Sequence, residues 1–241
     1  MATHVPLGRR VLARGIIFLD LAIAQIAVLG VIVAHTFDLA PQGWPTQLAA
    51  AAAALVGAAA LAGCERRWPE TQEALIGSVF VVAASLGVLL LAGDPHGGEH
   101  LSELLTGQIL WATPEQTARL GLLYAGLMAV WAWRSNRPGG AGLGALGFYL
   151  IFALAITASV QLVGVYLVFA SLILPALAVR GASPRRGLGV GWLLGALAYS
   201  AGLAASALVD WPAGPAIVIA LALTALLAGK ARWVAANGLR R

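Results

Sequence analysis

The longest uncharged stretch of the chain decides the fold class. From residue 138 to residue 179 it reads PGGAGLGALGFYLIFALAITASVQLVGVYLVFASLILPALAV, and Arg137 and Arg180 bound it on its two sides. As a helix at about 1.5 Å per residue, this stretch would measure roughly 63 Å, about twice the hydrocarbon thickness of a bilayer. We therefore expect two membrane-spanning helices here, joined by a turn near Gln161 to Gly164.

The composition extends this interpretation to the whole chain. Hydrophobic residues make up 60% of the 241 residues, charged residues 10%, and the mean hydropathy is +0.87. Soluble domains average about 45–50% apolar and about 25% charged residues. These values exclude a cytosolic enzyme, a disordered chain and a secreted disulfide scaffold. The net charge of +5 does not indicate a nucleic-acid partner, because the basic residues flank apolar segments.

Apolar stretches long enough to cross a bilayer as helices occur eight times in the sequence. We predict an all-α, polytopic membrane protein that forms a single transmembrane domain over residues 1–241, after a short N-terminal segment at 1–14. In the weakest stretch, the fourth, Thr113-Pro114-Glu115-Gln116 predicts a capping box that starts the helix before its apolar part. The predicted spans are residues 15–35, 46–63, 74–92, 113–133, 141–160, 162–179, 187–209 and 212–229.

The basic residues fall on one side of this eight-span arrangement. Of the 15 Lys and Arg residues, all but Arg119 lie on the side of the two chain termini. The positive-inside rule then places both termini in the cytoplasm. The outer side carries most of the acidic residues, together with His35, His96 and His100. Such a face attracts cations or a basic partner, although acidic residues also simply tolerate translocation.

Polar side chains inside or beside the predicted spans are the first candidates for function. Asp20 and Gln25 lie in the first span, where an ionisable group is costly and so indicates a functional role. The alternative is that Asp20 lies near enough to the cytoplasmic end to reach water or Arg14. Gln161 falls at the predicted outer turn, where it either lines a path or caps a helix end.

The outer loop after the third span holds the sequence HGGEH at residues 96–100. Its spacing matches an inverted zinc-peptidase pattern, but Pro95 and the glycine pair predict a turn instead of the rigid helix that such catalysis needs. Imidazoles and carboxylates together suit a borderline divalent metal such as zinc. The alternatives for His96, Glu99 and His100 are therefore a loose metal-binding position and a solvated loop.

Glycines recur at every fourth position in the seventh span, at Gly187, Gly191 and Gly195. Such a stripe lets helix backbones approach closely, within the chain or at a subunit interface. The sequence contains no G-x-x-x-x-G-K-[ST] motif, so the chain does not itself bind ATP through a P-loop. No nucleophile–base pair stands out, and we predict no enzyme activity in this chain.

Four stretches together resemble the membrane permease subunits of ABC importers for zinc, manganese and iron chelates. In chain order they are AIAQIAVLGVIVA (22–34), HLSELLTGQILW (100–111), LVGVYLVFASLILPALAVR (162–180) and DWPAGPAIV (210–218). The resemblance covers most of the chain in the order of the family. Asp20 lies one place away from the family's aspartate, Gln25 stands at its histidine, and Gln161 stands where members often have lysine.

The resemblance implies a multi-pass permease of the plasma (inner) membrane that imports divalent zinc, manganese or iron. A separate ABC ATPase subunit would bind ATP, and an extracytoplasmic metal-binding protein would deliver the metal. Two copies of the chain would form a homodimer among the membrane lipids, and the chain would hold no cofactor of its own. Asp20, Gln25 and Gln161 would line or gate the path, with His96, Glu99 and His100 at its outer end.

A cytoplasmic segment at residues 175–186 is the predicted contact with the ATPase. We expect Pro175 to interrupt the helix near the inner surface and Pro184 to begin the next helix. Arg180 and Arg185 lie in this segment. The resemblance implies a coupling helix here, and the alternative is an ordinary basic inner loop.

Three other functions remain open from the sequence. An ion-coupled secondary transporter would use Asp20 as its ion site. A membrane metalloprotease would use His96 and His100. A vitamin B12 or siderophore permease would share the architecture, although such chains are usually longer.

Overall fold

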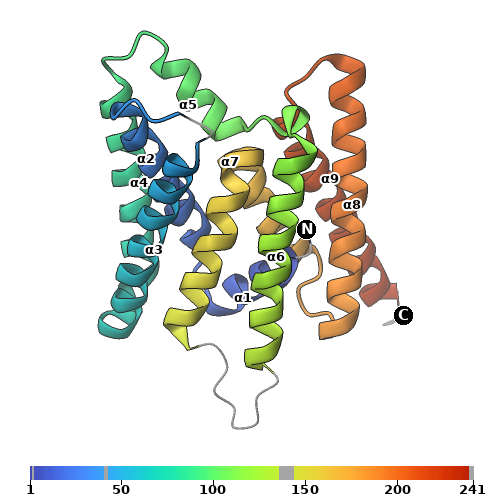
Figure 1. Cartoon of the computed structure of the whole chain (residues 1–241). Coiled ribbons are helices and arrows are strands. Elements are labelled where there is room, and N and C mark those ends of the chain that lie inside the picture. The colour runs from blue at the N-terminus through green and yellow to red at the C-terminus, as the bar shows by residue number, and fades with distance from the viewer. Residues whose placement is uncertain (2, 41–42, 136–143, 239–241) are drawn as a thin grey trace. The chain divides into compact units, whose positions relative to one another are not determined.

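The computed structural model describes residues 1, 3–40, 43–135 and 144–238 (Figure 1). Over these residues all regular structure is helical, and there is no strand. The chain divides into two compact units, one of Ile16–Val165 and one of Met1–Gly15 with Tyr166–Arg241. The predicted all-α, multi-pass architecture is confirmed.

Six helices of the described part of the chain are long and apolar enough to cross a membrane. They are α2 (Leu19–Thr36), α3 (Trp44–Arg67), α4 (Gln72–Leu91), α7 (Ala145–Ala178), α8 (Pro184–Val209) and α9 (Ala213–Gly238). The predicted fourth span is α6 (Pro114–Ser135), whose first turns carry Glu115 and Arg119. Together with the two parts of α7, these helices account for all eight predicted stretches. The first residues of the fifth stretch, 141–143, lie outside the described residues.

The turn predicted near Gln161 to Gly164 is confirmed inside α7. Gly164 has φ 77° and ψ 164°, a conformation that side chains with a Cβ rarely adopt. A Cβ at Gly164 would also collide with the backbone of Gly107, which itself has φ 73°. Gln108 N–H donates to the Leu162 carbonyl at 3.3 Å. Two glycines thus let the segment before α6 lie against the interruption of α7.

The unit Ile16–Val165 is built around α2, which packs against both α3 and α4. On α3, Ala50, Ala54 and Ala58 recur every four residues and are buried. A Cβ at Gly30 of α2 would lie 2.9 Å from Ala50 Cα, so the two backbones are in close contact. Small residues at a helix interface allow this approach. Larger side chains such as Val56 point outward and are exposed, as expected for a lipid-facing surface.

In the other unit, the N-terminal segment forms a helix, α1 (His4–Arg14), that packs on α8. The predicted glycine stripe of α8 faces it. A Cβ at Gly191 would lie 2.8 Å from Val5 Cγ1, Gly187 faces Arg9, and Gly195 faces Met1. The stripe is therefore a packing surface within this unit.

The expected interruption of the helix at Pro175 is wrong. Pro175 lies inside α7, which continues to Ala178, and the Val179 N–H donates to the Pro175 carbonyl at 3.2 Å. Proline is tolerated in membrane-spanning helices when a neighbouring group or a local adjustment satisfies the backbone carbonyl that loses its hydrogen bond. The described residues between α7 and α8 form a short turn without a separate helix, and Pro184 begins α8 as predicted.

Candidate functional site

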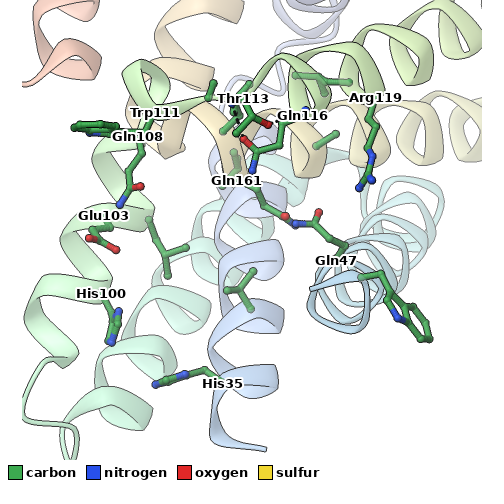
Figure 2. A pocket seen from close by; sticks show the side chains of 18 of the residues that line it. His35, Gln47, His100, Glu103, Gln108, Trp111, Thr113, Gln116, Arg119 and Gln161 are labelled. Carbon is green, nitrogen blue, oxygen red and sulfur yellow. Dashed lines mark hydrogen bonds between the residues drawn. The ribbon is translucent and has the colours of Figure 1, made fainter. Parts of the chain in front are cut away.

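A pocket of about 480 Å³ lies within the unit Ile16–Val165 (Figure 2). Its walls come from α2, α3, α6, the first part of α7 and a further helix, α5 (Gly97–Thr106). Imidazole and carboxamide groups dominate its polar lining, which includes His35, Gln47, His100, Glu103, Gln108, Gln116, Arg119 and Gln161. Such donors and acceptors can replace part of the hydration shell of a small polar solute.

Three side chains of types that can bind a metal lie together beside this pocket: His35 in the last turn of α2, Asp94 after α4, and His100 in α5. His35 and His100 line the pocket, and Asp94 lies behind them. His35 Nε2 lies 3.5 Å and His100 Nε2 3.9 Å from Asp94 Oδ2. One ligand atom from each of the three residues lies within 4.8 Å of the others. The two imidazole rings have their centroids 5.2 Å apart. We call this set the His35–Asp94–His100 cluster.

The turn between α4 and α5 holds the cluster's carboxylate in place. The His96 N–H donates to Asp94 Oδ1 at 2.9 Å, and the Gly97 N–H donates to the Asp94 carbonyl at 3.0 Å. The His96 N–H bond lowers the pKa of Asp94; partial burial opposes this shift, and His35 and His100 add to it. Asp94 is therefore an anion around neutral pH.

The expected turn is present at Pro95 and His96 but does not extend over Gly97 and Gly98, because α5 begins at Gly97. A Cβ at Gly97 would collide with the Leu91 carbonyl, so this glycine permits the close return of the chain after α4. His100 consequently lies on a helix, one turn after His96. This placement turns His100 toward the pocket, whereas His96 and Glu99 are exposed and lie outside the cluster.

Two of the three cluster residues were not predicted as metal ligands. His35 lies on the predicted outer side of the membrane, and Asp94 lies in the loop after the third predicted span, but nothing in the sequence pairs them. The signal that could have found them is topological. In the predicted arrangement α2 is the first span and α4 is the third. The two helices therefore cross the membrane in the same direction, and their C-terminal ends lie on the same side of the membrane.

The predicted residues of the first span are buried in α2. Asp20 has no exposed surface, and neither of its carboxylate oxygens has a hydrogen-bond partner among the described residues. Gln25 is 6% exposed. Neither residue is among those that line the pocket. A buried carboxyl group without a partner is costly, which is the physical reason to expect a role for it.

Gln161 lines the pocket from α7. Its buried Nε2 has no hydrogen-bond partner among the residues that the structure describes. Figure 2 shows its side chain pointing toward that of Gln47. A donor left open inside a polar pocket is available to a solute or to water.

The predicted capping box is confirmed at the rim of the pocket. The Thr113 N–H donates to Gln116 Oε1 at 3.0 Å, and the Gln116 N–H donates to Thr113 Oγ1 at 3.2 Å. Farther along α6, the Tyr124 hydroxyl donates to the Ala155 carbonyl of α7 at 3.1 Å. The box and this bond fix the wall that α6 contributes.

The predicted coupling residues lie in the other unit. Arg180, Pro184 and Arg185 are exposed around the turn between α7 and α8. The Arg9 guanidinium of α1 donates to the carbonyls of Ala182 at 3.1 Å and Pro184 at 3.2 Å. The turn therefore presents basic side chains while two hydrogen bonds from Arg9 of α1 restrain its backbone.

A model of the ABC 3 transport family matches residues 2–135 and 143–231. The chain therefore belongs to the ABC 3 transport family. This membership confirms the resemblance to ABC-importer permeases that the four sequence stretches indicated, and it makes the chain a transport subunit of a multi-pass membrane family.

Two known proteins illustrate the relationship. A Chlamydia pneumoniae protein described as a probable metal transport system membrane protein is 27% identical over 202 residues, which cover 75% of this chain and 69% of that protein. The solved structure of PsaBC from Streptococcus pneumoniae in complex with Fab matches with a TM-score of 0.72 at 21% identity, over 96% of this chain and 88% of the other. The second match supports the fold.

Proposed function

We propose that this chain is the permease subunit of an ABC importer and that it carries a divalent transition metal across the plasma (inner) membrane. The observation that carries the proposal is Asp20, an unpartnered carboxyl group buried in a helix of membrane-spanning length. The membership in a transport family and the metal transport system described for the Chlamydia relative support this cargo. Gln25 and Gln161 would assist Asp20 along the path.

The proposal includes an ATPase as a second subunit, which binds ATP and pushes on the turn between α7 and α8. Support comes from the exposed Arg180 and Arg185 and from the Arg9 bonds that restrain this turn. A restrained turn transmits a push better than a free loop. Two copies of this chain would form a homodimeric permease, and two ATPase subunits would bind its cytoplasmic face. A metal-binding protein would dock at the outer face. The chain itself would carry no cofactor and catalyse no reaction.

Uptake into vesicles tests the proposal. The purified chain, alone or with its copurified ATPase, is reconstituted around a metal-sensitive dye, and Zn²⁺, Mn²⁺ or Fe²⁺ is added outside. We expect uptake only with both the ATPase and ATP. Uptake by the chain alone, driven by an ion gradient, would contradict the proposal and support the secondary transporter.

The ATPase contact has its own test. Reversing the charge of Arg180 and Arg185 together should reduce copurification of the ATPase. Lys230, an exposed basic residue near the end of α9, provides a matched control, and Lys230→Glu should leave copurification unchanged. Equal losses in both variants would place the contact elsewhere.

A further inference from the structure

We infer that His35, Asp94 and His100 form a binding site for a divalent transition metal at the predicted outer end of the pocket. The three residues come from two separate segments of the chain, the end of α2 and the junction of α4 with α5. None of the predicted metal residues other than His100 belongs to this site. The site is independent of Asp20, which does not line the pocket.

The spacing of the ligand atoms is close to what a metal requires. Zinc binds imidazole nitrogen at about 2.0–2.1 Å and carboxylate oxygen at about 2.0–2.2 Å, so two donors on one tetrahedral ion lie roughly 3.3–3.5 Å apart. Asp94 Oδ2 already lies 3.5 Å from His35 Nε2 and 3.9 Å from His100 Nε2. No pair of the three ligand atoms is more than 4.8 Å apart, so each separation differs by little more than an ångström from that on a tetrahedral ion.

The donor set selects the class of ion. Two nitrogens and one oxygen suit zinc and its first-row neighbours, whereas magnesium and calcium prefer oxygen ligands alone. Three protein ligands leave a coordination position open to water or another ligand, whereas structural zinc sites are closed by four protein ligands. The cluster is also half-exposed, with the His35 side chain 42% and the Asp94 side chain 24% accessible. An ion can therefore reach this site and leave it.

The surroundings of the cluster favour a passing ion over a purely structural contact. His35 and His100 both line the pocket, and Glu103 and Gln108 follow on the same wall (Figure 2). The carboxylate is anchored through its other oxygen by the His96 N–H, which leaves Oδ2 directed at the two imidazoles. The hydrogen bond from the His96 N–H thus orients Asp94 in the way that outer-shell hydrogen bonds orient ligands in known metal sites.

Metal binding to the purified full-length chain tests the site directly. The chain, with a tag that lacks histidine, is titrated in detergent with Co²⁺, and the visible d–d absorption is recorded. We expect one equivalent with the spectrum of a nitrogen- and oxygen-ligated ion, displaced by Zn²⁺ but not by excess Mg²⁺. Failure of the wild-type chain to develop this absorption would overturn the inference without reference to any variant.

Variants assign the ligands. His100→Ala and Asp94→Asn should each weaken Co²⁺ binding by more than about tenfold. Loss of an outer-shell partner already weakens metal affinity by about 10–100-fold, and these substitutions change the ligands themselves. Asp38→Asn is the matched control, since it removes a carboxylate near the same end of α2 and asparagine accepts its φ of 58°. His96→Ala separates this site from the loop site that the sequence spacing suggests. Unchanged binding in the first two variants, or lost binding in either of the last two, would overturn the assignment.

The role of this site as the first position of the cargo rests on the proposed function, whereas metal binding at the cluster does not. Asp20→Ala should retain the Co²⁺ spectrum of the cluster and lose ATP-driven uptake. If uptake proves independent of ATP while the spectrum persists, the proposed function fails and the site remains. If the spectrum disappears in Asp20→Ala but persists in His100→Ala, the ion binds at Asp20 and the inference is wrong.

Discussion

Replacing Asp20 with alanine should make the protein more stable and less active. A buried polar group without a hydrogen-bond partner costs about 1–3 kcal/mol, and both Asp20 oxygens are in this state among the described residues. The cavity left by the truncation, about 25 Å³, costs about 0.6 kcal/mol at about 24 cal/mol per Å³. The net gain is roughly 0.4–2.4 kcal/mol. For a chain of this size it raises the unfolding temperature by about 1–10 °C.

Thermal unfolding in detergent, followed by intrinsic tryptophan fluorescence, measures the stability, and ATP-driven metal uptake in vesicles measures the function. Thr157→Val is the matched control, because Thr157 Oγ1 is also buried without a partner in the described structure. That variant should gain stability and keep its uptake. A lower unfolding temperature for Asp20→Ala would show that the carboxyl group has a stabilising partner, and normal uptake would refute its role in the path.

Three further predictions concern packing, capping and pH. Gly202→Ala should lower the free energy of unfolding by about 1–3 kcal/mol, because its Cβ would lie 2.5 Å from Ile217 Cα in the backbone of α9. Gly189→Ala, on the same helix as Gly202, meets open space and should be neutral or slightly stabilising. Thermal unfolding measures both variants. Thr113→Ala should cost about 1 kcal/mol, because it removes the acceptor of the Gln116 N–H. Adding Gln116→Ala should cost a further amount of similar size, because Gln116 Oε1 accepts from the backbone N–H of residue 113, which the first substitution keeps; a double-mutant cycle measures whether the two costs add. Burial lowers the pKa of His4 to about 3, below the value of about 6.5 in the unfolded chain. The unfolded state therefore binds more protons below pH 6.5, stability falls as the pH decreases from there, and His4→Gln should remove that dependence.

Features governed by chain length and local hydrogen bonds were predictable from the sequence. The turn at Gly164 follows from an uncharged stretch twice as long as the membrane is thick, with basic residues at both ends. The capping box needs only four consecutive residues. Both predictions need only the residues of one segment, so they can be made without knowing how the segments pack.

Features decided by packing between segments were not predictable in this way. The apolar face of α1 is short and interrupted by basic residues, and it is buried because α8 presents glycines opposite it. Pro175 was expected to end a helix on local grounds, yet α7 continues past it. Sequence spacing likewise grouped His96 with His100, since a search within one loop can only find ligands that are near in sequence.

The position of the His35–Asp94–His100 cluster gives metal binding a mechanical consequence. Its ligands lie on two segments, so an ion bound there joins the end of α2 to the junction of α4 with α5. Such an ion binds only when all three ligands are within reach of it. At an ion concentration one hundred times the dissociation constant, binding stabilises that arrangement by about 2.7 kcal/mol. Because α2 also carries Asp20, the same helix would respond to the ion at its outer end and hold the carboxyl group nearer its inner end. Occupancy of the outer site would therefore bias the helix on which the proposed path depends, and this bias arises only because the ligands are shared between segments.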